Sequence, residues 1–172
     1  MVPAGQRTFS LLERLLLCLA LLAIGAYSTL DSNLPQPLGT DAPQNQFSAE
    51  RAFAHVQAIA KEPHPIGSAA NARVREYIET RLEKLGLTVK TQSFTFRRRD
   101  GGEVHGVNLI TEIPGTVRGA KAVALVCHYD SVPIGPGASD DGAGVATLLE
   151  TARALEASPP LSNSILLVFT DG

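Results

Sequence analysis

The fold is decided by the stretch AVALVCHYDSVPIGPGASDDGAG, which occupies residues 122–144. It opens with an apolar run, Val123–Cys127, and continues into a polar segment that is rich in glycine and proline. Such a run is typical of a strand buried on both faces of a sheet. Residues 142–156 then have the apolar spacing of a helix, and Ser164–Thr170 is a second apolar strand. Strand, helix and strand in this order predict a right-handed βαβ unit with parallel strands.

Polar side chains with metal-binding chemistry follow the first of these strands. His128 and Asp130 are two residues apart, so on an extended segment their side chains point the same way. Asp140 and Asp141 come next, at the start of the helix. Ligand sites in open α/β sheets lie at the carboxyl ends of strands, and imidazole and carboxylate groups are good zinc ligands. The plain alternative is a strand-end histidine followed by helix-capping aspartates, but the combined pattern favours a metal site.

The combination of H-Y-D-S, a Gly/Pro loop and S-D-D-G-A-G resembles the metal-binding core of the two-zinc aminopeptidases of peptidase family M28. The resemblance implies that His128 ligates one zinc and that Asp140 bridges both zinc ions. It implies that Asp130 is a catalytic residue that orients the site. It also implies a cis peptide bond directly after Asp140. The resemblance covers Phe47–Gly172, but its specificity lies almost entirely in residues 123–149.

The N-terminus carries a run that suits a membrane. Leu15–Leu30 is apolar apart from Ser28 and Thr29, and its 16 residues fall slightly short of the roughly 17–25 of a spanning helix. Arg7 and Arg14 precede the run, which places the N-terminus on the cytoplasmic side. An uncleaved signal anchor and a signal peptide cleaved after Ser28 are both compatible with this pattern, and we favour the anchor. In either case the remaining chain is exported.

The sequence divides into three parts. Residues 1–30 form the signal anchor or transmembrane segment, residues 31–47 read as a Pro-rich linker, and residues 48–172 read as the N-terminal part of a zinc peptidase domain. The strand Ser164–Thr170 is informative here, because in the resembled family the matching strand leads into two adjacent glutamates, a general base and a zinc ligand. A further acidic ligand and a histidine come later in that family. We therefore expect this chain to be a fragment that is inactive alone.

Two helices and a hairpin connect the linker to the central strand. Ser48 is placed to cap the first helix, Ser68 or Asn71 to start the second, and Gly86 to end it. The P-H-P-I-G-S turn between these helices resembles that of membrane-bound members of the same family, and His55 and His64 are expected to be a helix-surface and a turn residue. A strand over 87–96, with a bulge where its alternation changes parity, and a strand over 104–113 then form an antiparallel hairpin. The resulting fold class is α/β, a three-layer sandwich with a mixed, mainly parallel sheet that is incomplete here, preceded by an N-terminal transmembrane helix.

Composition excludes several classes of function. The 172 residues are 44% hydrophobic and 19% charged, with a net charge of −2, so there is no basic excess for nucleic acid. Cys18 and Cys127 lie in an apolar run and a buried strand, and no disulfide is expected. No phosphate-binding glycine motif is present. A serine hydrolase using Ser131 or Ser139 with His128 would need a G-x-S-x-G elbow, which is also absent.

The sequence therefore predicts a zinc-dependent exopeptidase of the aminopeptidase type, with two zinc ions in the complete site. Its partners would be a peptide or protein substrate and the membrane, with the peptidase domain outside the cytoplasm or secreted after signal cleavage. The main alternative is a non-catalytic, membrane-anchored ectodomain on the same fold. Within the family, carboxypeptidases and glutaminyl cyclases share this core, and the sequence does not separate them.

Overall fold

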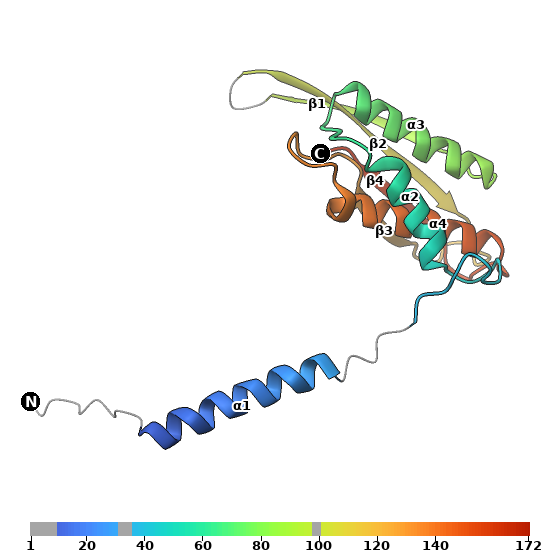
Figure 1. The fold of residues 1–172 in the computed structure, drawn as a ribbon. Helices are drawn as coiled ribbons and strands as arrows, with labels where there is room; N and C mark the ends of the chain where they lie inside the picture. The colour runs from blue at the N-terminus through green and yellow to red at the C-terminus, as the bar shows by residue number, and fades with distance from the viewer. Residues whose placement is uncertain (1–9, 31–35, 98–100) are drawn as a thin grey trace, which may run out of the picture. The chain divides into compact units, whose positions relative to one another are not determined.

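The structure is a computed structural model that describes residues 10–30, 36–97 and 101–172. Contacts divide the chain into two units, Met1–Gln36 and Pro37–Gly172 (Figure 1).

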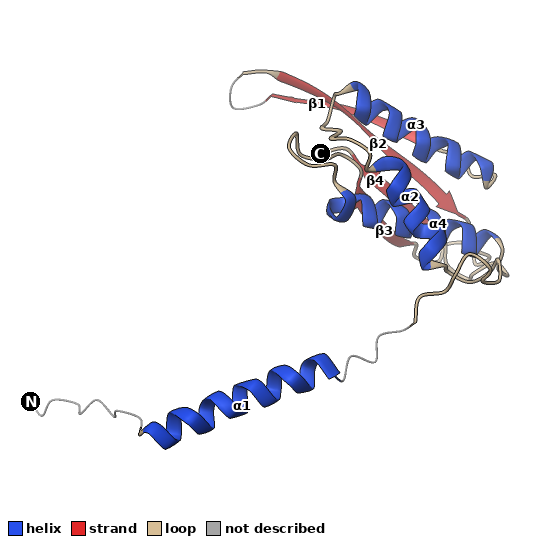
Figure 2. Cartoon of the chain, viewed as in Figure 1, coloured by secondary structure: helices blue, strands red, loops and turns tan. Residues whose placement is uncertain are grey.

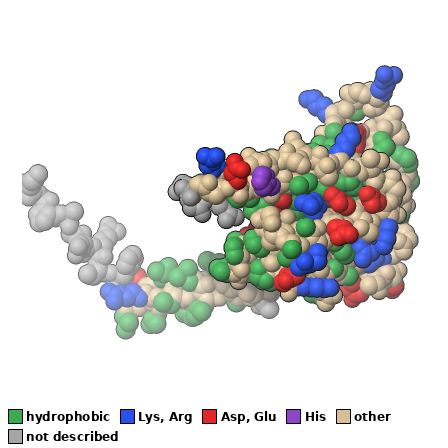
Figure 3. All heavy atoms as spheres, turned by 90° about the horizontal axis from the view of Figure 1, so that it is seen from above, with side chains coloured by type: hydrophobic (Ala, Val, Ile, Leu, Met, Phe, Trp, Pro, Cys, Tyr) green, Lys and Arg blue, Asp and Glu red, His purple; other side chains and the backbone are tan. Residues whose placement is uncertain are grey.

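The described part of the first unit is the helix α1, Leu11–Leu30. Ser10 and Glu13 form a reciprocal cap, in which the Ser10 hydroxyl accepts from the Glu13 amide and the Glu13 carboxylate accepts from the Ser10 amide. Apolar side chains are exposed along the helix (Figure 3), and Leu11–Thr29 is long and apolar enough to cross a membrane. The predicted apolar helix is thus present and begins four residues earlier. A signal sequence meets the same criterion, and Arg7 lies outside the described residues.

The second unit contains a mixed sheet with three helices against it (Figure 2). Its strand order is β1-β2-β4-β3, and the strands span Lys90–Arg97 (β1), Glu103–Ile113 (β2), Ile165–Thr170 (β4) and Val123–His128 (β3). The β3–β4 pair is parallel and the other two pairs are antiparallel. The predicted α/β class with a mixed sheet, the hairpin and the parallel β3–β4 pair are therefore confirmed. Among the strands that the structure describes, β3 and β4 are the only parallel pair.

Local sequence signals explain where the helices begin and end. The helices span Ala49–Ile59 (α2), Ala69–Lys84 (α3) and Ala143–Glu156 (α4). Ser48 and Ser68 cap α2 and α3 by accepting from backbone amides in the first turn. Gly86 has a φ of 83° just after α3, a left-handed conformation that suits glycine. The predicted bulge in the first strand was wrong, because the β1–β2 register is continuous from Lys90 to Arg97.

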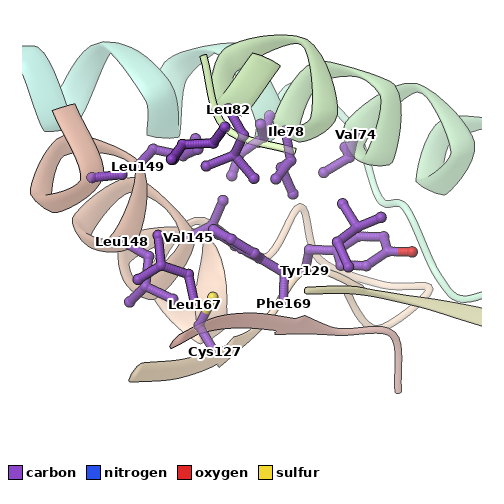
Figure 4. Close-up of a cluster of buried hydrophobic side chains, with 14 of the residues drawn as sticks. Val74, Ile78, Leu82, Cys127, Tyr129, Val145, Leu148, Leu149, Leu167 and Phe169 are labelled. Carbon is purple, nitrogen blue, oxygen red and sulfur yellow. The ribbon is translucent and has the colours of Figure 1, made fainter. Parts of the chain in front are cut away.

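The hydrophobic core lies between the sheet and the helices (Figure 4). Its fully buried members come from α3, α4 and the strands and include Ile78, Leu82, Leu109, Tyr129, Val145, Leu149, Leu167 and Phe169. Only one face of the sheet is covered in this way, since Val126 on the opposite face of β3 is 61% exposed. The prediction that β3 is buried on both faces was therefore wrong for the described residues, because α2, α3 and α4 all lie on one side of the sheet. The third layer of the predicted sandwich is not formed by this part of the chain.

Residues 37–46, which the sequence predicts as extended linker, are held against the domain by a buried carboxylate. Glu150 of α4 accepts hydrogen bonds from the Ser48 amide at 2.8 Å, from Arg51 at 3.0 Å and from Arg153 at 2.7 Å. Both guanidinium groups also donate to carbonyl oxygens of this segment. Burial alone would raise the pKa of Glu150, but these hydrogen bonds outweigh burial and lower it. The segment therefore packs as an integral part of the second unit.

Candidate metal centre

The predicted ligand residues meet at the carboxyl end of β3. His128 is the last residue of that strand, and the Tyr129 amide continues the pairing by donating to the Thr170 carbonyl of β4. The His128 ring lies between two carboxylates, with Nδ1 3.2 Å from Asp130 Oδ1 and Nε2 3.0 Å from Asp140 Oδ1. The expected contact between Asp130 and the His128 ring is thus present, and His128 and Asp140 face one another.

The loop that carries Asp140 has an irregular backbone. The peptide bond between Asp140 and Asp141 is cis, as the family resemblance implies. Gly137 has a φ of 66°, and its carbonyl accepts from the Gly142 amide at 2.8 Å. A Cβ at Gly137 would lie 2.9 Å from Cβ of Ser131, so both its conformation and its neighbours require glycine. The glycines of this loop therefore permit the backbone conformation that turns the Asp140 side chain toward His128.

Asp141 has a positioning role that the sequence did not reveal. Its carboxylate accepts from the Gly144 amide at 3.0 Å and from the His128 amide at 3.4 Å, so it joins the first turn of α4 to the end of β3. A Cβ on Gly144 would collide with this carboxylate. The signal was present in the motif, because aspartate is a favoured helix-capping residue. Only the fold shows that the same side chain also reaches the strand.

Ser131 ties the site to the turn between α2 and α3. Its hydroxyl accepts from the His64 amide at 2.7 Å and donates to the Val132 carbonyl, while the Ser131 amide donates to the His64 carbonyl at 3.2 Å. Both the serine and the histidine are buried. Because these bonds engage the hydroxyl away from His128, the geometry argues against Ser131 as a nucleophile activated by that histidine.

The electrostatics of His128 follow from its two carboxylate neighbours. Burial tends to lower its pKa, but the hydrogen bond to Asp140 and the charge and hydrogen bonds of Asp130 outweigh burial and raise it. The Asp140 side chain is 91% exposed, so the space beyond Nε2 opens to solvent. Nε2 and Asp140 Oδ1 lie 3.0 Å apart, so a cation with these two ligands would bind next to both atoms.

The donor set fits part of a zinc site. Neutral imidazole nitrogen and carboxylate oxygen are both zinc ligands, and His128 Nε2 and Asp140 Oδ1 already lie close together. Asp130 contacts the other ring nitrogen, which is the usual place for a carboxylate that orients a ligating histidine. Among the described residues there is no group of three or more His, Cys, Asp or Glu side chains that could hold a metal ion. These residues alone could therefore offer a metal two ligands and an orienting carboxylate.

The remaining histidines and Cys127 have other contacts. His55 bonds to the Tyr77 hydroxyl, His64 to a backbone carbonyl and His105 to the Thr95 hydroxyl. Cys127 is buried next to the site in sequence, and burial, followed by the charge of Asp141, raises the pKa of its thiol. A protonated, buried thiol is a poor metal ligand.

Comparisons with known proteins identify a family for part of the chain. Residues 108–172 match the family model described as peptidase family M28. A vacuolar membrane protease of Candida dubliniensis is 34% identical over 164 residues, which cover 87% of this chain and 17% of that protein. The chain therefore spans less than a fifth of this relative.

Solved structures share the fold. Glutaminyl cyclase of Porphyromonas gingivalis superposes with a TM-score of 0.66 and 30% identity, covering 73% of this chain and 45% of that one. A Zn-dependent exopeptidase of Parabacteroides distasonis gives a TM-score of 0.64 and 27% identity, covering 74% and 47%. Taken with the motif and its geometry, these matches identify residues 108–172 as part of a peptidase family M28 domain.

Proposed function

We propose that the full-length protein is a zinc-dependent exopeptidase of the aminopeptidase type, and that this chain carries part of its active site. The observation that carries the proposal is the convergence of His128 Nε2 and Asp140 Oδ1, 3.0 Å apart, with the Asp130 carboxylate on the other ring nitrogen. In this proposal His128 ligates one zinc, Asp140 bridges two zincs and Asp130 orients the imidazole. The family match and the Zn-dependent exopeptidase among the similar structures support it.

The residues of this chain would prepare the site before substrate arrives. With its proton on Nδ1, facing the Asp130 carboxylate, the His128 ring would leave the Nε2 lone pair available to a metal. Asp140 presents a carboxylate with two oxygens at the same point, and Asp141 and Ser131 hold the backbone on either side of it. Zinc bound there would act as a Lewis acid on the scissile carbonyl and would lower the pKa of a bound water.

We further propose that α1 anchors the protein in a membrane and that the peptidase domain lies outside the cytoplasm, with the organisation 1–30, 31–47 and 48–172 and with residues 37–47 packed on the last part. The apolar exposed surface of α1 and the membrane name of the fungal relative support this placement. Protease added to sealed membranes should degrade the domain only from the non-cytoplasmic side, and α1 should resist carbonate extraction. A domain that is degraded from the cytoplasmic side would contradict the orientation, and a soluble product would favour signal cleavage.

A second candidate function is glutaminyl cyclisation. It is favoured by the structural similarity to glutaminyl cyclase at 30% identity. Both activities would use the same ligand cluster, so the residues described here do not separate them. The product does, because hydrolysis releases the first amino acid, whereas cyclisation of an N-terminal glutamine releases ammonia and keeps the peptide intact.

A panel of peptides tests the proposed function. The full-length protein is expected to release the first residue of peptides with a free N-terminus and to leave N-acetylated peptides uncut, whether or not the C-terminus is amidated. A chelator should abolish turnover, and added zinc should restore it, since the ligands here favour zinc. Mass spectrometry of a glutamine-led peptide distinguishes hydrolysis from ammonia loss. Absence of any turnover in the zinc-loaded, full-length protein would favour the non-catalytic ectodomain instead.

A further inference from the structure

A fully buried carboxylate lies directly after β4, outside the set of predicted ligands. Asp171 Oδ1 accepts from the Asn71 side-chain amide at 2.9 Å, and Oδ2 accepts from the Val107 backbone amide at 3.0 Å. The Asp171 amide donates to Asn108 Oδ1 at 3.0 Å. Burying a carboxylate is costly unless it is well hydrogen-bonded, and here α3 and β2 supply those bonds.

The chain turns a corner directly after β4, at Asp171 and Gly172. This corner contacts the metal centre through Gly172. The Gly172 amide donates at 2.8 Å to Asp130 Oδ1, which is the oxygen that also faces Nδ1 of His128. A second connection runs through Tyr129, which lies between His128 and Asp130 in the chain. Its hydroxyl donates to the Val107 carbonyl at 2.7 Å, while the Val107 amide donates to Asp171.

Tyr129 remains a donor in this arrangement. The Val107 carbonyl oxygen that it contacts can only accept, so the phenol hydrogen lies on this bond. The segment from His128 to Asp130 is thus held at its centre by Tyr129 and at its end by Gly172. Both contacts depend on the backbone that Asp171 fixes.

We propose that Asp171, held by Asn71, is a positioning residue for the metal centre. It fixes the corner after β4 so that the Gly172 amide keeps the Asp130 carboxylate turned toward His128. The chain of contacts runs from the first turn of α3 through Asp171 and Gly172 to Asp130 and the ligating imidazole. The proposal rests on the proposed function, because it assigns Asp171 to the same zinc site.

The decisive experiment reverses the direction of one hydrogen bond. In Asp171→Asn a side-chain amide faces two donors, Asn71 Nδ2 and the Val107 amide, and can accept from only one of them. In the double variant Asn71→Asp/Asp171→Asn, the donor and acceptor exchange sides, so both bonds can form again. We expect Asp171→Asn in the full-length protein to weaken zinc binding and to lower kcat about tenfold, the lower end of the roughly 10–100-fold range for partners outside the ligand set. KM should change little, and the double variant should recover most of both losses.

A matched control separates positioning from general stability. Thr111 is a buried polar residue of β2 whose hydroxyl donates to the Thr88 carbonyl, and its partner across the sheet is Leu167 rather than Asp171. Thr111→Val should therefore destabilise the fold while leaving zinc affinity and kcat unchanged. If Asp171→Asn accumulates poorly, Asn71→Ala tests the same contact from the other side. Equal zinc affinity and kcat in Asp171→Asn and Thr111→Val, or a double variant no better than the single one, would overturn the proposal.

The test also distinguishes this proposal from the proposed function. Hydrogen exchange in the metal-free, full-length protein measures protection of the backbone at residues 128–130 and 171–172 without any need for turnover. Exchange there should be faster in Asn71→Ala and should return toward the wild-type rate in the double variant. A wild-type protein that binds no zinc would refute the proposed function, whereas unchanged exchange in Asn71→Ala would refute the positioning role alone.

Discussion

Replacing His128 with alanine in the full-length protein is expected to abolish peptide turnover and to lower the amount of bound zinc. In the proposed site the ring would supply a nitrogen ligand, and its Nε2 lies 3.0 Å from the Asp140 carboxylate. Asp140→Ala should have the same effect, because a bridging carboxylate serves both ions. The loss of turnover should exceed the roughly 10–100-fold typical of residues that only orient a ligand. Zinc content by atomic spectroscopy and kcat/KM for a free-N-terminal peptide are the measurements.

Two further variants make this prediction specific. Asp130→Asn keeps the shape of the orienting side chain but removes its charge, so it should cost turnover more than zinc content. His105→Ala removes another histidine, which contacts Thr95 on the β1–β2 hairpin, and should change neither quantity. Zinc stoichiometry and turnover that survive in His128→Ala would show that the metal centre has been assigned to the wrong residues.

The proximity of the candidate ligands could be predicted from sequence because these residues are close together in the chain. His128, Asp130 and Asp140 sit on one strand end and the following loop, so a local motif brings them to one edge of the sheet. The supporting residues are different. Asp171 and Asn71 are 100 positions apart in the sequence and meet only after β4 has packed beside β2 and α3 has covered the sheet. No local sequence pattern predicts the contact between Asp171 and Asn71.

The fold shows the same division between local and distant information. Helix caps, the hairpin and the parallel pair follow from short patterns, as Ser48, Ser68 and Gly86 illustrate. The packing of residues 37–46 could not be predicted from short patterns, because it depends on Glu150, about a hundred positions further on. The exposure of one face of β3 could not be predicted either, because an apolar run has no alternation that shows which face a helix covers.

The largest stability effect is expected where β4 crosses the centre of the core. Leu167 is fully buried between the sheet and the helices, and Leu166 is its neighbour on the opposite, half-buried face. Leu167→Ala removes methyl groups from a packed core and should lower the free energy of unfolding by about 2–5 kcal/mol. The change is measured by chemical denaturation of the full-length protein. Loss of the protease resistance of this domain reports its unfolding.

Leu166→Ala is the matched variant, because it makes the same substitution one residue away on the other face. A three-layer sandwich covers both faces of its sheet, so in the full-length protein this leucine should also be buried and should also cost about 2–5 kcal/mol. Since α2, α3 and α4 all lie on the Leu167 side, these helices do not supply the layer over Leu166. A cost below roughly 1 kcal/mol for Leu166→Ala, beside a full cost for Leu167→Ala, would show that this face stays open to solvent. That outcome would contradict the three-layer architecture and leave a two-layer domain with an exposed apolar sheet.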